Sequence, residues 1–209
     1  MPILYLGLDP SRYPRKVFHY PVIRTVPVGA LGVEAKVAWS SATHVLFTSR
    51  SAVKHWLALS SVEGKEVLAV GPATAALLGA DTKIAPVATQ EGVVDLLKTM
   101  DLSGTFLFWP RSALARPVVT DYLTNEKVPF YALDLYETKW QRPEPVPDLA
   151  DFDEIVFTSP TTVDAFLNIF GTLPKDKRLT PIGPVTEKAL QRRGLFIKYE
   201  PVLKEYVLL

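Results

Sequence analysis

Hydroxyl side chains and glycines gather in two short motifs, and each motif occurs twice in the chain. Phe-Thr-Ser stands at 47–49 and again at 157–159, and Gly-Pro-x-Thr stands at 71–74 and again at 183–186. Each copy lies where an apolar run gives way to an amphipathic one, as at a strand-to-helix junction. The first N–H groups of a helix are unpaired and carry partial positive charge, so they bind carboxylates or phosphates. The motifs therefore predict a site for an anionic ligand.

The candidate binding residues are the polar and small residues at these four places. In the first half they are Thr48, Ser49, Ser51, Gly71, Ala73 and Thr74, and in the second half Thr158, Ser159, Thr161, Gly183, Val185 and Thr186. Serine and threonine are also common helix caps, and the alternative for any one residue is a cap without a ligand. Because polar residues recur at equivalent places in both halves, we favour binding for the set.

Two further kinds of side chain have the chemistry to act on an anionic substrate. Tyr136 ends a predicted strand, and a phenol donates a hydrogen bond or a proton while it stays neutral. Arg111 and Arg116 follow the apolar run 105–110, where they would meet carboxylates. The alternatives are a tyrosine packed at a strand edge and arginines on a solvated surface.

Several other chemistries and settings have no support. The chain lacks cysteine, and His19, His44 and His55 have no metal-ligand spacing, so we expect no metal. Neither a Gly-rich nucleotide motif nor GxSxG occurs. The 23 basic and 22 acidic residues give a net charge of +1, which argues against nucleic acid as a partner. No apolar run has the length of a membrane span or a signal peptide, so we expect a soluble cytoplasmic protein, and a monomer.

Alternating strands and helices must position these residues. Proline follows the motif residue in Ser159-Pro160, Gly71-Pro72 and Gly183-Pro184, as at the first position of a helix, and Pro117 predicts a helix to about Asn125. Short apolar runs that end in turn residues are typical of buried parallel strands, and they stand at 44–49, 67–71, 105–110, 155–159 and 179–183. This alternation predicts an α/β fold with parallel sheets.

The motifs recur in one order, which indicates duplication of a unit of about 100 residues. The runs near 3–8 and 21–26 resemble those at 105–110 and 130–136 but lack motifs of their own. The simplest arrangement is a discontinuous α/β domain of residues 1–28 plus 141–209, with an inserted α/β domain at 29–140. Two extended linkers would join them, the second of them rich in proline.

Taken together, the motifs resemble those of the uroporphyrinogen-III synthase family. They are FTS, VGPxTA, FWPRSxxAR, LYET, FTSP and IGPxT, and in this order they cover almost the whole chain. The resemblance implies two flavodoxin-like parallel-sheet domains, the second inserted in the first and linked to it by two strands. It places the active site in the cleft between the domains. It also implies a lyase of porphyrin and heme biosynthesis that uses no metal and no cofactor.

The family's substrate is hydroxymethylbilane, a linear tetrapyrrole with carboxylate side chains. Loss of the terminal hydroxyl leaves an azafulvene, and closure with inversion of ring D and loss of water gives uroporphyrinogen III. An electron-rich pyrrole expels hydroxide unaided, but uncatalysed closure gives the uninverted isomer. The protein's task is to hold the chain so that the substituted carbon attacks and a spiro intermediate forms, which is catalysis by positioning.

Site residues carry over from the family by resemblance. Tyr136 in LYET would assist loss of the hydroxyl, and Thr186 in GPVT matches the family's active-site threonine. Thr74 and Ser159 fall where the family contacts substrate. The further candidates for substrate contact are Ser49, Ser51, Arg111 and Ser112.

Three places depart from the family pattern. Arg50 and Ser51 stand where members often carry proline and then arginine or asparagine, which weakens the case for a ligand contact at Ser51. Segment 9–20 has room for little more than a turn where the family has a helix. The chain stops at EYVLL, where the family's last helix continues. The last two departures bear on the stability of the first domain.

Two alternatives come from other classes of protein. The first is a non-catalytic two-lobed binding protein for an anionic small molecule, which has no need of the Tyr136 phenol. The second is an interaction module of duplicated flavodoxin-like domains. It would carry apolar residues at the strand ends, where this sequence has Ser, Thr and Gly.

Overall fold

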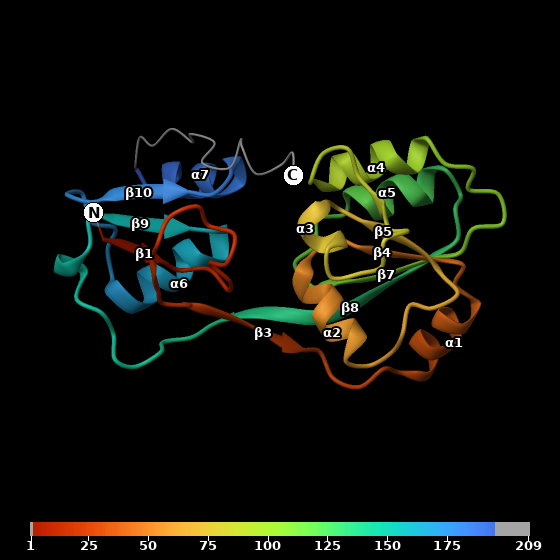
Figure 1. Ribbon diagram of the computed structural model, residues 1–209, viewed down its shortest axis with the longest axis horizontal. Helices are drawn as coiled ribbons and strands as arrows, with labels where there is room; N and C mark the ends of the chain where they lie inside the picture. Colours follow the sequence, from red (N-terminus) through yellow and green to blue (C-terminus); the bar gives the residue numbers. More distant parts are fainter. Residues whose placement is uncertain (1, 195–209) are drawn as a thin grey trace. The chain divides into compact units, whose positions relative to one another are not determined.

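A computed structural model describes residues 2–194, and its contacts divide the chain into two compact units (Figure 1). The first unit contains the residues up to Arg24 and resumes at Thr138, and the second unit is Thr25–Glu137. Both divisions fall inside strands that pair with each other, β3 (Ile23–Pro27) and β8 (Phe130–Trp140). The chain therefore passes twice from one unit to the other, each time along a strand.

The second unit is built on a sheet of strand order β3-β8-β7-β4-β5-β6. Its other strands are β4 (His44–Phe47), β5 (Glu66–Ala69), β6 (Lys83–Ile84) and β7 (Leu107–Ser112). The pairs β4·β5, β4·β7, β5·β6 and β7·β8 are all parallel. Numbered along the chain from β4, the run β8-β7-β4-β5-β6 has the order 5-4-1-2-3, which is a circular permutation of the flavodoxin-like order 2-1-3-4-5. The expectation of a parallel α/β fold is confirmed.

Helices cover both faces of this sheet. Successive residues of a strand point to opposite faces, and apolar residues on each face pack against helices. Val45 and Phe47 pack in one apolar cluster with residues of the first two helices, and Leu46 between them packs in another with residues of the last two. The helices are α1 (Val33–Ser41), α2 (Arg50–Leu57), α3 (Pro72–Ala75), α4 (Gln90–Lys98) and α5 (Val118–Asn125). Pro117 directly precedes α5, and the helix ends at Asn125, as predicted.

The first unit has a parallel sheet of order β10-β9-β1-β2. Numbered along the chain from its β2 edge, the order is 2-1-3-4, which is the start of the flavodoxin-like order. Its strands are β1 (Ile3–Tyr5), β2 (Phe18–His19), β9 (Glu154–Phe157) and β10 (Arg178–Pro181). Its helices are η1 (Leu149–Asp151), α6 (Pro160–Phe170) and α7 (Pro184–Gln191). Residues 195–209, which include the EYVLL segment, lie outside the described residues.

A strand was predicted near 21–26 in the first domain. β3 forms there but joins the second unit's sheet, and β2 pairs beside β1. Val22 and Ile23 are still buried in the first unit's core. The backbone of Val22 pairs on both sides: its N–H donates to the Leu6 carbonyl at 3.2 Å, and its carbonyl accepts from the Gln141 N–H at 2.8 Å. Segment 9–17 forms only turns and irregular chain, as expected.

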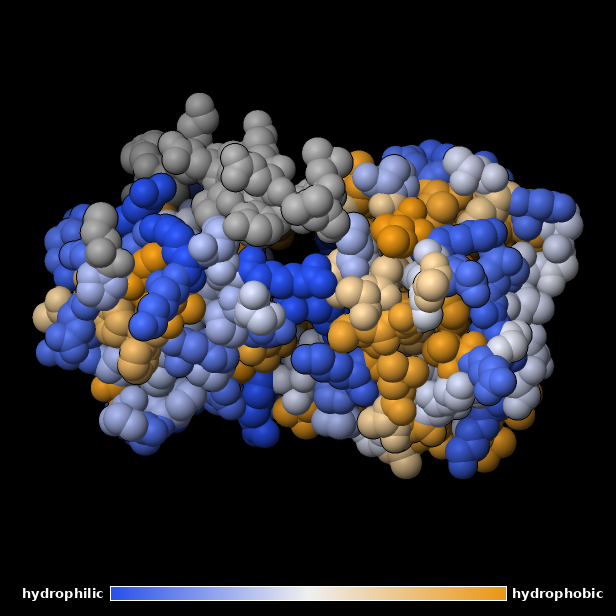
Figure 2. All heavy atoms as spheres, in the orientation of Figure 1, coloured by the Kyte–Doolittle hydropathy of each residue, from blue (hydrophilic) through white to orange (hydrophobic). Residues whose placement is uncertain are grey.

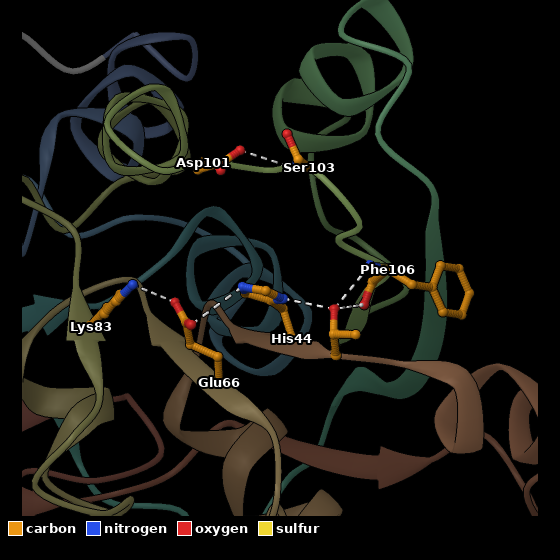
Figure 3. Close-up of polar contacts among 7 residues, drawn as sticks. His44, Glu66, Lys83, Asp101, Ser103 and Phe106 are labelled. Atoms are coloured by element: carbon orange, nitrogen blue, oxygen red, sulfur yellow. Dashed lines mark hydrogen bonds and ion pairs between the residues drawn. The ribbon is translucent and has the colours of Figure 1, made fainter.

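Polar contacts also hold the amino ends of the strands in the second unit (Figure 3). Glu66 on β5 forms an ion pair with Lys83 on β6, and His44 Nε2 on β4 lies 3.5 Å from its carboxylate. Thr43 links this group to β7, because its hydroxyl accepts a hydrogen bond from the Phe106 N–H at 3.0 Å. This network therefore joins neighbouring strands at the edge where they begin.

The surface of the second unit carries apolar side chains near α2 and α3 (Figure 2). Leu57 and Leu59, at the end of α2 and beyond it, and Leu77, beyond α3, are each more than a third exposed. Within residues 2–194, no helix is long and apolar enough to cross a membrane.

Candidate active site

The carboxyl ends of parallel strands in the second unit surround a pocket of about 230 Å³. Four predicted site residues line it: Thr48, Ser49, Ser112 and Tyr136. Thr48 and Ser49 follow β4, and Ser112 ends β7. Tyr136 was predicted to end a strand, but it lies within β8, which continues to Trp140; the three strands are neighbours in the sheet. Ligands of open parallel sheets bind at this edge, because strand ends and helix starts meet there. Sequence positions far apart are therefore brought to one place.

A bulge between β7 and β8 positions Tyr136. The register runs from Arg111 opposite Asp134 to Ser112 opposite Tyr136, so Leu135 is the extra residue. A bulge re-aims the side chains beside it, and such bulges are common next to active sites. As a result Leu135 and Tyr136, although consecutive, are buried in the same cluster, and Ser112 comes to the level of Tyr136.

The Tyr136 hydroxyl lies 2.8 Å from the Ser49 hydroxyl. Ser49 is the N-cap of α2, and its oxygen accepts a hydrogen bond from the Ala52 N–H at 3.0 Å. The cap fixes the serine rotamer, so it also fixes the partner of the phenol. On its other side the Tyr136 ring stacks on His55, with ring centroids 5.3 Å apart.

The phenol is neutral in this setting. Tyr136 is only 5% exposed, and burial raises its pKa, while hydrogen bonds with Ser49, Ser112 and Ser51 offset only part of the rise. Burial also lowers the pKa of His55, whose Nε2 lies 2.9 Å from the Thr25 hydroxyl. The pair is therefore an uncharged phenol stacked on an uncharged imidazole at neutral pH.

Thr48 and Arg111 have partners inside the protein. The Trp109 Nε1–H donates to the Thr48 hydroxyl oxygen at 3.2 Å. Arg111 Nε donates to Asp134 at 2.9 Å, and the guanidinium lies 5.1 Å from the Trp109 ring centroid. The Arg111 charge is thus balanced by Asp134, and Arg111 is not among the residues that line the pocket.

Gly71, Ala73 and Thr74 lie at the start of α3 and do not line this pocket. Thr74 is only 4% exposed. A Cβ on Gly71 would lie 2.9 Å from the Ala88 side chain, so the close approach of the neighbouring loop requires glycine there. The helix is short and ends at Ala75.

In the first unit, FTSP forms the N-terminus of α6. Ser159 is the N-cap, and its oxygen accepts from the Thr162 N–H, while the Thr162 hydroxyl oxygen accepts from the Ser159 N–H at 3.2 Å. The same oxygen accepts from the Thr158 N–H at 3.1 Å. Thr161 is the next residue of the first turn and is partly exposed. The predicted cap is confirmed, and the ligand contact stays a prediction.

The second motif of the first unit forms the start of α7. Gly183 is the N-cap residue, and Pro184 is the first residue of the helix, as predicted. Thr186 is 3% exposed, and its N–H donates to the Gly183 carbonyl at 3.1 Å. The Val185 side chain is 60% exposed, so both its side chain and its backbone are accessible at the start of α7.

Sequence reasoning missed two residues around Tyr136. His55 stacks on the Tyr136 ring without lining the pocket, and nothing in the spacing of His55 pointed to Tyr136. Thr89 lines the pocket and caps α4, where its oxygen accepts from the Gly92 N–H at 3.0 Å. The position of Thr89 directly before the amphipathic run of α4 could have identified it as a helix cap. Within residues 2–194, no group of three or more metal-ligating side chains is placed to hold a metal ion.

These features define a class: a two-unit parallel α/β protein with hydroxyl groups at its strand ends and a buried neutral phenol. A family model described as uroporphyrinogen-III synthase HemD matches residues 11–204. The match spans most of the chain, so the chain belongs to the uroporphyrinogen-III synthase family, whose reaction is the cyclisation of a linear tetrapyrrole by a lyase.

Two solved structures share the fold. Uroporphyrinogen-III synthetase from Helicobacter pylori is 18% identical, with a TM-score of 0.61, over 95% of this chain and 92% of that one. A mutant uroporphyrinogen III synthase from the extremely thermophilic bacterium Thermus thermophilus is 16% identical, with a TM-score of 0.57, over 93% of this chain and 89% of that one. No curated protein matches the sequence.

Proposed function

We propose that this chain converts hydroxymethylbilane to uroporphyrinogen III, with Tyr136 assisting loss of the terminal hydroxyl. The observation that carries the proposal is the 2.8 Å hydrogen bond between the Tyr136 and Ser49 hydroxyls, in a pocket at the carboxyl ends of parallel strands. A buried phenol has the chemistry for this step, because it donates a proton or a hydrogen bond without carrying charge.

Ser49 directs the phenol proton. Its oxygen already accepts from the Ala52 N–H, so its own proton is available for the Tyr136 oxygen. Tyr136 then donates outward, to the departing hydroxyl of the substrate. The hydroxyl leaves as water and the azafulvene forms, while the serine hydrogen bonds stabilise the oxygen that has given up its proton. Ring closure releases one proton from a pyrrole carbon, which restores the phenol.

The remaining hydroxyls and helix starts bind and orient the substrate in this proposal. An extended molecule with several carboxylates needs several anchors, and oriented N–H and O–H groups supply them without a net charge. Thr186 stays our candidate for a second active-site residue, in the first turn of α7. The proposed binding residues are Thr48, Ser49, Ser51, Gly71, Ala73, Thr74, Arg111, Ser112, Thr158, Ser159, Thr161, Gly183 and Val185.

The test is a product analysis. Hydroxymethylbilane is supplied to the purified protein, the products are oxidised, and type I and type III porphyrins are separated by chromatography. We expect an excess of type III over a protein-free control. Type I alone, from a sample that unfolds cooperatively, would overturn the proposal and favour a non-catalytic binder of anionic small molecules.

We also propose that the chain works as a monomer in the cytoplasm and without nucleic acid. Support comes from its composition: there is no cysteine, and the net charge is +1. Light scattering during size-exclusion chromatography should give a mass near 23.2 kDa. A dimer mass across the whole concentration range would contradict the proposal.

A further inference from the structure

The loop between β7 and α5 closes one side of the pocket that contains Tyr136. Leu114 and Ala115, from the middle of this loop, are among the residues that line the pocket. Leu114 is the largest aliphatic side chain of the lining, and it is 66% exposed. A single exposed leucine on a protein surface needs no explanation. An exposed leucine in the lining of a pocket of hydroxyl groups, however, gives that pocket an apolar wall.

Hydrogen bonds from the site itself fix the first half of this loop. The Ala113 N–H donates to the Tyr136 carbonyl at 3.0 Å, and the Leu114 N–H donates to the Ser112 hydroxyl oxygen at 3.2 Å. The Ala115 N–H donates to the Ser112 carbonyl at 2.9 Å. Three successive N–H groups are therefore bonded to the two residues that stand level at the bulge, which places Leu114 relative to the phenol.

Arg116 anchors the other half of the loop to α4. Two guanidinium nitrogens donate to the two carboxylate oxygens of Glu91 at 2.6 and 2.9 Å, and such a two-pronged pair fixes geometry as well as charge. Gln90 lines the pocket and adds a further tie. In the amide orientation that satisfies both groups, it donates to the Arg116 carbonyl at 2.8 Å and accepts from the Arg116 N–H at 3.2 Å. Arg116 was expected to meet carboxylates, and the one it meets belongs to the protein itself.

The size and the two-sided lining of the pocket suit one part of the substrate. Its volume of about 230 Å³ is below the ~300–1,000 Å³ of sites that enclose a whole drug-sized ligand, so it suits one ring of a tetrapyrrole. A pyrrole ring has apolar faces and carries its substituents at the edge. Leu114 and Ala115 offer contact to a face. The hydroxyls of Ser49, Ser112 and Tyr136 offer hydrogen bonds to a polar substituent.

We propose that Leu114 packs on the face of the pyrrole ring whose hydroxymethyl group meets Tyr136, and that the Arg116–Glu91 pair holds Leu114 in place for this contact. The inference rests on the proposed function and adds to it a loop that positions the substrate. Because the loop is already ordered, the contact costs little conformational entropy when the substrate binds. The same contact keeps the ring at the site after the hydroxyl has left, when early release would give the uninverted product.

The experiment compares Leu114→Ala with Leu59→Ala. Leu59 is a matched control, because it is 52% exposed beyond the end of α2 in the same unit and does not line the Tyr136 pocket. Leu114→Ala removes three carbons from the contact, so KM for hydroxymethylbilane should rise by about tenfold in this variant only. At matched rates of substrate consumption, the share of type I porphyrin should rise with it. Leu114→Met keeps the apolar area and should restore both values toward the wild type.

The ion pair is tested from both sides. Arg116→Gln and Glu91→Gln break the same pair, so each should raise KM and the type I share, by less than Leu114→Ala because the Gln90 tie remains. The double variant should be no worse than either single variant, because residues of one pair have non-additive effects. Each single variant leaves one exposed charge in water, which costs little stability.

The outcomes separate this inference from the proposed function. Thermal unfolding of every variant establishes that each is folded. If the wild type makes no type III product, the proposed function fails. If the wild type is active and folded Leu114→Ala matches Leu59→Ala in KM and in the type I share, this inference alone fails. Additive effects of Arg116→Gln and Glu91→Gln would overturn the part that is assigned to their ion pair.

Discussion

At the scale of the residue, the chemistry centres on the Tyr136 hydroxyl. Tyr136→Phe removes one oxygen and keeps the ring that stacks on His55 and fills the cluster around Phe47. We expect kcat to fall by about 10²-fold, in the range of a lost general acid, with the free energy of unfolding changed by about 1 kcal/mol or less. The measurement is the initial rate of type III formation.

The matched control for this variant is Tyr122→Phe. Tyr122 lies on α5 in the same unit and is absent from the pocket that contains Tyr136. Its variant should keep the wild-type rate. Equal rates for Tyr136→Phe and the wild type would remove the phenol from the mechanism.

A second prediction at this scale concerns Glu154, whose side chain is 1% exposed at the start of β9. Burial raises its pKa, but hydrogen bonds from Arg15 and Thr180, each 2.6 Å long, outweigh burial and leave the pKa below its usual 4.5. A carboxyl with a depressed pKa in the folded state stabilises the protein above its unfolded pKa. That stability is lost as pH falls below about 4.5.

Glu154→Gln tests this reading. The variant loses a hydrogen-bonded charge, so its free energy of unfolding at pH 7 should fall by about 1–3 kcal/mol. Denaturant unfolding from pH 7 down to pH 3 should give a shallower acid slope for the variant than for the wild type. If the free energy of unfolding fell with pH equally steeply in the variant and the wild type, the acid sensitivity would come from another group. One such group is Glu91, where Arg116 lowers the pKa to about 2.

At the scale of the element, Ser49 and Ser159 make a matched pair. Both are N-caps whose oxygens accept the N–H of the third residue on, in α2 and α6 respectively. Each change to alanine should lower the free energy of unfolding by about 1 kcal/mol, because a first-turn N–H loses its partner. Only Ser49 also contacts the Tyr136 hydroxyl.

The pair therefore separates capping from catalysis. We expect Ser49→Ala to lower kcat clearly, and Ser159→Ala to leave kcat near the wild-type value whatever it does to KM. Urea unfolding and steady-state rates on the same samples provide the comparison. Equal losses of kcat in the two variants would mean that Ser49 acts through helix stability alone.

At the scale of the whole molecule, the second unit has apolar clusters of its own. Those clusters draw on α1, α2, α4 and α5 and on the strands between them, and all their residues fall within Thr25–Glu137. Residues 23–140, which keep β3 and β8 whole, should therefore unfold cooperatively when expressed alone. Circular dichroism during heating provides the measurement.

The isolated fragment should still make no type III product. Two of the candidate site residues, Thr161 in α6 and Thr186 in α7, belong to the first unit and are missing from it. Mixing the fragment with hydroxymethylbilane should leave the type I product of the protein-free control. A broad, non-cooperative melt would show that the second unit needs the rest of the chain to fold.

The sequence by itself determined what depends on short-range chemistry. Apolar runs followed by Ser159-Pro160 or Gly183-Pro184 specify strand-to-helix junctions, because proline and the capping residue act within one turn. These junctions, with the repeated motifs, were enough to predict the parallel α/β fold and the family. Thr48, Ser49 and Tyr136 were likewise found as candidates from residue type and place.

Only the tertiary structure decided which of these residues meet. The bulge at Leu135 brings Ser112 level with Tyr136, and the stacking of His55 follows from the packing of α2 on β8. The register of β3 against β8 depends on pairing between strands more than one hundred residues apart in sequence. Such register is fixed by long-range hydrogen bonds and by burial, and no local pattern encodes either.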